Sequence, residues 1–275
     1  MIEFPIAKIN LGLNIVSKRP DGYHNLETVF YPVPIKDALE VCVMDDGFPS
    51  PTDCDLKTTN MPIAGNEQDN LVVRAYNLLK QNYKLPRVHA HLYKNIPTQA
   101  GMGGGSSDCA SMIKLLNRMF GLGMSGSEME AASARLGADC PFFITAAPAY
   151  AEGVGERLHP LRLDLCGWTL AVVCPGIPVS TKEAFRHVIP HPTSVKCRDI
   201  VARPVETWRG NLTNDFEESV FRQHPEIGRI KEKLYSLGAT YASMSGSGSS
   251  VFGLFSAPIA LANHFSGMRT HCVML

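Results

Sequence analysis

The sequence predicts an α+β protein of two domains. Segments with the two-residue period of strands and segments with the 3.6-residue period of helices both occur, and they do not alternate as a regular βαβ array would. The chain has 275 residues, which allows one large domain or two modest ones. A turn-rich segment, EGVG at 152–155, falls near the middle. We therefore place the domains at 1–155 and 156–275.

The first half contains both kinds of period. Residues 1–16 alternate apolar and polar side chains, with a change of phase at Ala7–Lys8 that indicates a break or bulge in a strand. Further strands are predicted over 23–33, 39–44 and 88–93, and helices over 70–82 and 109–120. Ser127 with Glu130 predicts a capping box for another helix, which ends at 136–137. Residues 46–66 are polar and rich in proline, so we interpret them as loops.

The second half begins with a short apolar run, WTLAVVC at 168–174, which is typical of a buried strand. Asn214 with Glu217 predicts the start of a helix, and another helix is expected over 226–237. A loop of small residues at 245–250 precedes a strand over 251–255.

The composition restricts the possible partners. Lys plus Arg and Asp plus Glu both number 26, so nothing indicates a nucleic-acid or anionic-membrane partner. The eight cysteines are scattered without a CxxC pair, which favours reduced, buried thiols over a disulfide framework or a zinc site. The opening MIEFPIAKIN has no basic segment ahead of an apolar run, and no apolar run approaches about 18 residues. We expect a cytoplasmic protein.

The strongest functional signal is the glycine-rich stretch GMGGGSS at 101–107. Four glycines in five positions allow the backbone to approach a ligand closely, and the N–H groups of a following helix would face the same point, which suits a phosphate. The stretch is not a Walker A loop, because no Gly-Lys-Ser/Thr closes it, and the dinucleotide pattern would need glycine where Ser106 stands. A flexible loop with a serine-capped helix is the plainer alternative.

Three stretches together resemble the GHMP kinases. Residues 96–108, IPTQAGMGGGSSD, are similar to the glycine-rich motif that wraps the ATP phosphates in that family. PIAKINL at 5–11 resembles the family's first motif, and MSGSGSSVF at 244–252 resembles the third. The resemblance implies the GHMP kinase fold, in which an N-terminal domain like ribosomal protein S5 domain 2 precedes a ferredoxin-like α/β sandwich. It also implies ATP and Mg²⁺ as cofactors.

The same resemblance implies the catalytic and nucleotide-binding residues. Asp139 would take the proton of the acceptor hydroxyl, and Lys8 would bind that oxygen and keep the carboxylate ionised. Without the resemblance, Lys8 is an exposed strand lysine and Asp139 a turn residue. No dedicated metal ligand is expected, because Mg²⁺ often bridges substrate phosphates with few protein contacts. The predicted ATP site comprises Lys94, Pro97, Thr98, Gln99, Ala100, Gly101, Met102, Gly103, Gly104, Gly105, Ser106 and Ser107, with Asn70 as a weaker candidate.

Three further stretches resemble a subgroup of GHMP kinases whose acceptor is a small molecule carrying cytidine diphosphate. They are RPDGYH at 19–24, LGADCPF at 136–142 and EGVGE at 152–156. A cytosine needs an aromatic platform and in-plane polar partners. The implied acceptor-binding residues are Asn10, Tyr23, His24, Thr181 and Phe185, with the base between the two aromatic rings and His24 at its polar edge.

Other interpretations remain open at this point. Tyr23 and Phe185 could equally be ordinary half-buried aromatics. The chain could be another GHMP kinase, of the homoserine or mevalonate type, or a non-catalytic nucleotide-binding regulator; a dinucleotide-dependent oxidoreductase is disfavoured by the glycine pattern. We expect a monomer or weak homodimer.

Overall fold

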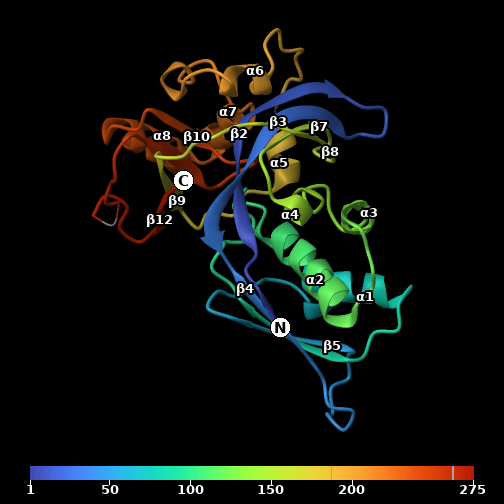
Figure 1. Ribbon diagram of the computed structural model, residues 1–275. Helices are drawn as coiled ribbons and strands as arrows, with labels where there is room; N and C mark the ends of the chain where they lie inside the picture. The colour runs from blue at the N-terminus through green and yellow to red at the C-terminus, as the bar shows by residue number, and fades with distance from the viewer. Residues whose placement is uncertain (187, 262) are drawn as a thin grey trace. The chain divides into compact units, whose positions relative to one another are not determined.

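The computed structural model describes residues 1–186, 188–261 and 263–275 (Figure 1). Three four-stranded sheets and eight α-helices are formed within these ranges, so the α+β prediction is confirmed. Two compact units interleave along the chain. Unit 1 is Met1–Ala7, Ile35–Thr98 and Gly103–Ala146, and unit 2 is Lys8–Pro34, Gln99–Met102 and Ala147–Leu275. The predicted boundary at 155/156 divides the chain only once, and it stays a prediction.

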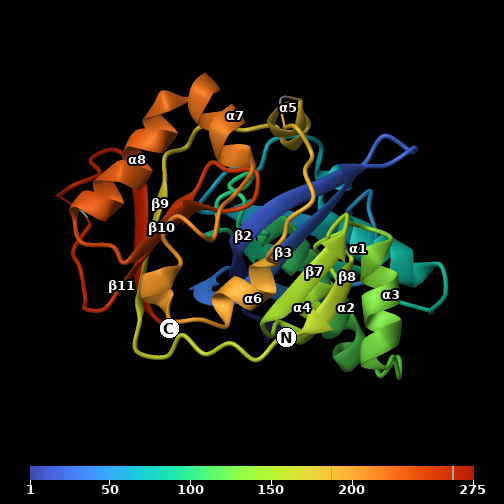
Figure 2. The same cartoon turned by 90° about the horizontal axis from the view of Figure 1, so that it is seen from above.

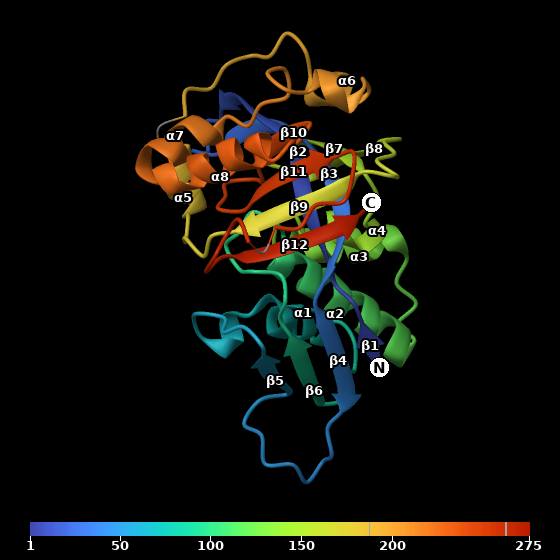
Figure 3. The same ribbon diagram turned by 90° about the vertical axis from the view of Figure 1, so that its left-hand side faces the viewer.

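Unit 1 is a sheet covered by helices. Its strand order is β1 (Ile2–Glu3), β4 (Ala38–Val43), β6 (Val88–Tyr93) and β5 (Cys54–Thr59), with β5 parallel to β6 and the other pairs antiparallel. Helices α1 (Leu71–Lys80) and α2 (Gly104–Phe120) lie side by side against the sheet (Figure 3). Their apolar residues recur every three or four positions, and these faces form one core with β4, β5 and β6.

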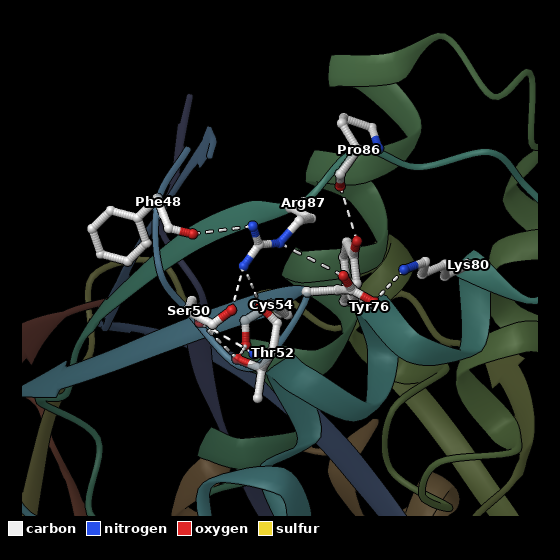
Figure 4. Close-up of polar contacts among 9 residues, drawn as sticks. Phe48, Ser50, Thr52, Cys54, Tyr76, Lys80, Pro86 and Arg87 are labelled. Atoms are coloured by element: carbon white, nitrogen blue, oxygen red, sulfur yellow. Dashed lines mark hydrogen bonds and ion pairs between the residues drawn. The ribbon is translucent and has the colours of Figure 1, made fainter. Parts of the chain in front are cut away.

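Strand β5 corrects the prediction that residues 46–66 are loops. Cys54 and Leu56 are buried and alternate with more exposed neighbours, but two apolar residues are too few to give a visible period. Pairing with β6 therefore overrides the local signal. The irregular chain before β5 is held by Arg87, whose guanidinium donates to the carbonyls of Phe48 (3.2 Å) and Ser50 (2.5 Å), as Figure 4 shows.

The capping boxes need correction. Helix α3 (Gly126–Ala134) starts two residues earlier than predicted, because the reciprocal bonds of the capping box are formed by Ser125 and Glu128 and not by Ser127 and Glu130. The sequence offers two Ser-x-x-Glu pairs two residues apart, and pattern alone does not distinguish them. The short helix α4 (Phe142–Thr145) completes unit 1.

Unit 2 contains the other two sheets. One has the order β2 (Ile6–Lys18), β3 (His24–Lys36), β7 (Ala149–Gly153) and β8 (Arg157–Pro160). The other is antiparallel, with the order β10 (Tyr241–Met244), β11 (Val251–Phe255), β9 (Thr169–Cys174) and β12 (Arg269–Met274). Every residue of β9 is buried, as its continuous apolar run predicts.

The helices of unit 2 are α5 (Thr181–Phe185), α6 (Cys197–Val201), α7 (Phe216–Gln223) and α8 (Pro225–Ser236). Figure 2 shows α7 and α8 together beside β9, β10 and β11, with which they share an apolar core. Helix α8 confirms the prediction over 226–237. At α7, the Asn214 side chain accepts the Phe216 N–H (3.0 Å), but Glu217 turns away and accepts the Met244 N–H (2.8 Å) instead.

Strand β2 is distorted at a glycine. The strand continues through Ala7–Lys8, where the phase of apolar residues changes, and its left-handed residue is Gly12 at φ +70°. A Cβ at Gly12 would lie 2.6 Å from Leu212 Cδ1 and 2.7 Å from Cys197 Sγ. Both the backbone angle and the packing therefore require glycine.

Gly12→Ala should lower the free energy of unfolding by about 2–4 kcal/mol, because left-handed strain adds to overpacking. Gly210→Ala is the matched control, since Gly210 has φ +80° but no atom within 4 Å of its Cβ position. The free energy of unfolding of the control should fall by only about 1–2 kcal/mol, because it has the left-handed backbone strain without the overpacking. Urea unfolding measures both losses, and equal losses would contradict the packing argument.

Candidate active site

The glycine-rich stretch forms the N-terminus of a helix. Helix α2 begins at Gly104, five residues before the predicted start, because its first turn consists of small residues without an apolar period. Its N-cap is Gly103, in the left-handed conformation at φ 68°, and no side chain caps it. The first-turn N–H groups of a helix have no intrahelical partners. An anion can therefore bind at this end.

A buried ionic cluster in unit 1 involves Lys94. Its ammonium pairs with Asp37 Oδ2 and lies 2.7 Å from Asp108 Oδ2, and all three side chains are at most 3% exposed. Asp37 also accepts the N–H groups of Asn95 (2.5 Å) and Ile96 (2.7 Å) through Oδ1. The predicted ATP-site residue Lys94 therefore already has two carboxylate partners. Sequence reasoning missed Asp37 and did not single out Asp108.

Burial and the charges within this cluster shift the pKa values of Lys94 and Asp108. Burial opposes the charge of Lys94, but the attraction of Asp108 and Asp37 outweighs it and raises the pKa of the ammonium. Burial raises the pKa of the Asp108 carboxyl to about 7, and repulsion by Asp37 adds to the rise, although Lys94 opposes it. Among the described residues, Asp108 Oδ1 is one of two buried side-chain atoms without a hydrogen bond, whereas both Asp37 oxygens are paired. Asp108 is therefore the carboxyl group of the cluster whose neutral form is favoured by burial.

A pocket of about 380 Å³ opens beside this cluster. It is lined by Leu56, Thr58, Ile63, Ala64, Gly65, Asn66, Glu67, Asp69, Asn70, Leu71, Lys94, Thr98, Gly105 and Asp108, all of unit 1. Lys94, Thr98 and Gly105 were predicted to bind ATP. Asn70 also caps α1 by accepting the Val72 N–H (2.9 Å), as its plainer interpretation had it.

Asp139 lies in the same unit, in the turn between α3 and α4. It is partly buried. The thiol of the next residue, Cys140, is hydrogen-bonded with Cys109 and with Ser106 of the glycine-rich stretch, and both bonds lower its pKa. A Cβ at Gly137 would stand 3.0 Å from Cys140 Sγ and 3.9 Å from Ser106 Oγ. The turn of Asp139 is therefore packed against the first turn of α2.

Unit 2 joins the first part of the glycine-rich stretch to the third motif. Gly101 has φ 73°, and a Cβ there would collide with the carbonyl group of Ser245, whose carbon would be 2.7 Å away. The Ser245 hydroxyl donates to the Gly101 carbonyl (2.8 Å), and the Ser250 N–H donates to the Ala100 carbonyl (3.2 Å). These two segments, 144 residues apart in sequence, therefore meet backbone to backbone.

The first motif, at residues 5–11, contacts both the glycine-rich stretch and the third motif. The Lys8 N–H donates to the Met102 carbonyl (3.0 Å), and the Asn10 N–H donates to Ser245 Oγ (3.3 Å). The Lys8 ammonium donates to Asn10 Oδ1 (2.5 Å) and lies 4.8 Å from the centre of the Phe30 ring. Lys8 is 3% exposed, so its interpretation as an exposed strand lysine is wrong.

The predicted acceptor residues are partly brought together. The rings of His24 and Phe185 stack with centroids 4.8 Å apart and planes 15° apart, whereas Tyr23 is 65% exposed. Burial lowers the pKa of His24, and the nearby charge of Lys18 lowers it further. The Thr181 hydroxyl lies 3.1 Å from the hydroxyl of Ser247, so α5 contacts the third motif.

The described part of the chain also bears on the predictions about cysteines, metal ligands and membrane spans. All eight cysteines are free of disulfides, but only five are buried, because Cys42, Cys166 and Cys272 are exposed. No group of three or more His, Cys, Asp or Glu that could hold a metal ion occurs in the described part of the chain. Every helix among the described residues is too short or too polar to cross a membrane.

Comparison with known proteins identifies the class. The model of the GHMP kinase N-terminal domain matches residues 70–146, and that of the GHMP kinase C-terminal domain matches 199–267. The chain therefore belongs to the GHMP kinase family, and the predicted GHMP kinase fold is confirmed. The Methanococcus jannaschii mevalonate kinase structure shares this fold, with a TM-score of 0.69 at 14% identity.

Relatives of higher sequence identity are named as one particular enzyme of this family. The chain is 53% identical to the 4-diphosphocytidyl-2-C-methyl-D-erythritol kinase of Bacteroides fragilis, over 93% of this chain and 92% of that one. It is 52% identical to the enzyme of the same name from Bacteroides thetaiotaomicron, over 99% and 98%. A crystal structure of 4-(cytidine 5'-diphospho)-2C-methyl-D-erythritol kinase matches with a TM-score of 0.81 at 32% identity, over 99% and 98%.

Asp108→Asn should destabilise the protein less at about pH 8 than at about pH 5. Because the pKa of Asp108 is raised to about 7 in the folded chain, its contribution to stability is full below the ordinary value of 3.8 and is lost as the pH rises through 7. Asparagine has no such proton to release. The difference in unfolding free energy between wild type and variant should shrink by roughly 2–3 kcal/mol across that window.

Urea unfolding at the two pH values measures this difference. Asp53→Asn is the control, since Asp53 is a half-exposed carboxylate of the same unit that pairs with Lys80. Its effect should change little with pH. A penalty for Asp108→Asn that stays the same at the two pH values would show that the folded carboxylate is ionised throughout.

Proposed function

We propose that this kinase transfers the γ-phosphate of ATP to the 2-hydroxyl of 4-diphosphocytidyl-2-C-methyl-D-erythritol, a step toward isoprenoid precursors by the non-mevalonate route. One observation carries the choice of acceptor. Relatives that are 52–53% identical over at least 93% of this chain are named for that acceptor. The mevalonate kinase likenesses, at 13–14% identity, support the fold alone.

The phosphate donor is assigned to unit 1 and its glycine-rich stretch. The uncapped N-terminus of α2 offers N–H groups to the triphosphate. The pocket beside it has apolar walls at Leu56 and Ile63 and polar groups at Asn66 and Thr98, a mixture that suits a nucleoside. Mg²⁺ would bridge the phosphates and neutralise their charge, and the Ser106 hydroxyl could serve as a ligand without any dedicated carboxylate.

Asp139 and Lys8 are assigned the chemistry. Asp139 accepts the proton of the acceptor hydroxyl, and Lys8 stabilises the negative charge that grows on that oxygen. The structure supports each residue separately. Lys8 is buried and tied to the glycine-rich stretch through Met102. The turn that carries Asp139 contacts Ser106 of the same stretch through the next residue, Cys140. The two residues belong to different units, so their joint action rests on the family membership.

The acceptor's base is assigned to the aromatic residues of unit 2. Phe185 presents a ring on α5, and the exposed Tyr23 offers a second ring next to His24 in sequence. His24 covers one face of Phe185, so a cytosine that stacks on that face requires the imidazole to turn aside. The displaced imidazole would then serve as the polar partner at the edge of the base. Asn10 and Thr181 are assigned to the polar part of the acceptor.

The proposal predicts which acceptor releases ADP. Purified protein with MgATP should form ADP rapidly with 4-diphosphocytidyl-2-C-methyl-D-erythritol and not with homoserine or mevalonate, because neither of these has a base to stack. A coupled assay for ADP measures all three. ADP formation with homoserine or mevalonate would contradict the acceptor, and none with any acceptor would favour a nucleotide-binding regulator.

Asp139→Asn should lower kcat by about 10²–10⁴-fold, the usual contribution of a general base. Asparagine keeps the size of the side chain, so the melting temperature and MgADP affinity should remain at the wild-type values. Asp46→Asn, in an exposed loop of the same unit, is the matched control and should turn over normally. Wild-type turnover by Asp139→Asn would remove Asp139 from the mechanism.

A further inference from the structure

A lysine ammonium without solvent exposure lies beneath the first turn of α2. Lys94 is 0% exposed, and its Nζ is shared by Asp37 and Asp108. A Cβ built on Gly104 would stand 2.9 Å from that nitrogen. Since non-bonded atoms do not approach a real Cβ so closely, only glycine allows the backbone to rest directly on the ammonium.

Asp37 extends the same support to the segment that enters the glycine-rich stretch. Its Oδ1 accepts the N–H groups of Asn95 and Ile96, and its own N–H donates to the Pro5 carbonyl (2.9 Å). Ile96 Cγ2 also lies 2.9 Å from the Cβ position of Gly104. Gly104 therefore rests on two groups that are both fixed by Asp37.

A position just before a phosphate-binding stretch makes Lys94 look like a ligand of the phosphates. The structure argues otherwise. If the ammonium left the cluster to reach a phosphate, Asp37 and Asp108 would be left buried without their cation, which is strongly unfavourable. The end of a lysine side chain normally yields to a neighbour. This one cannot, because two buried carboxylates hold it.

We propose that Lys94 is a positioning residue of the phosphate-binding stretch, in which the ammonium fixed by Asp37 and Asp108 supports Gly104 and does not itself contact the triphosphate. This inference rests on the proposed function in taking the triphosphate of ATP as the ligand. Placement matters here because phosphoryl transfer depends on position and charge, and a misplacement of about 1 Å can cost about 10²-fold in rate.

Gly104→Ala tests the support without changing any charge. Gly104 is a helical residue outside the left-handed region, so alanine fits its backbone, and within the protein its Cβ presses against Lys94 and Ile96. Gly126→Ala is the matched control, because Gly126 is the first residue of α3 and has no atom within 4 Å of its Cβ position. MgADP binding by calorimetry, both KM values, kcat and the melting temperature are measured for each.

Gly104→Ala should weaken MgADP binding by about 10-fold or more and raise the KM for ATP in proportion, because the N–H groups of the first turn are displaced. The KM for the cytidyl substrate should stay within about twofold, which a general loss of structure would not spare. Gly126→Ala should match wild type throughout. Since MgADP binding needs no acceptor, this result stands even if the proposed acceptor is wrong.

Lys94→Met provides the second comparison, with Lys80→Met on the exposed side of α1 as its control. Lys94→Met should lower the melting temperature and also weaken MgADP binding, whereas Lys80→Met should leave MgADP binding unchanged. The inference is overturned if Gly104→Ala binds MgADP as Gly126→Ala does, since a phosphate ligand at Lys94 would not depend on that contact. If Lys94→Met does not fold, Gly104→Ala decides alone.

Discussion

The close packing of bare backbone at Gly101 and Gly104 is the constraint on which the site depends. At Gly101 the chain lies against the carbonyl group of Ser245, and at Gly104 it lies against the ammonium of Lys94. A Cβ at either position would push the glycine-rich stretch off its support. These glycines are therefore required by the protein's own packing, in addition to any approach of a ligand. Each unit holds the half of the stretch that belongs to it, and Met102–Gly103 is the peptide bond that joins the halves.

Local charges have to attract the proposed triphosphate, because the chain as a whole is neutral. Two carboxylates offset the charge of Lys94, so the cluster adds no net positive charge beneath the stretch. The attraction is left to the N–H groups at the start of α2, to Lys8 and to the metal ion that accompanies ATP. Lys94 supports the stretch, but its charge is already neutralised by the two carboxylates. The group that supports the stretch is therefore different from the groups that bind the phosphates. The support then need not change when the ligand arrives or leaves.

The sequence predicts those parts of the fold whose pattern is local. Strands β6 and β9 and helix α1 show the period or apolar run that their burial demands, whereas β5 has only Cys54 and Leu56 to mark it. The glycine-rich stretch is visible because close backbone approach needs glycine. The cluster around it is not, since Lys94 lies 57 residues from Asp37 and 14 from Asp108, and no local period links them. The stacking of His24 on Phe185 likewise depends on tertiary packing.

The central claim is that bare N–H groups at 101–107 bind the phosphates of the nucleotide. Backbone amide NMR with MgADP and with adenosine tests it directly, because the two ligands share the nucleoside and differ in the phosphates. The account predicts that amides of Gly103, Gly104 and Gly105 shift with MgADP and not with adenosine, whereas pocket residues at 63–71 shift with both. Loop amides that ignore MgADP, or that respond equally to adenosine, would contradict it.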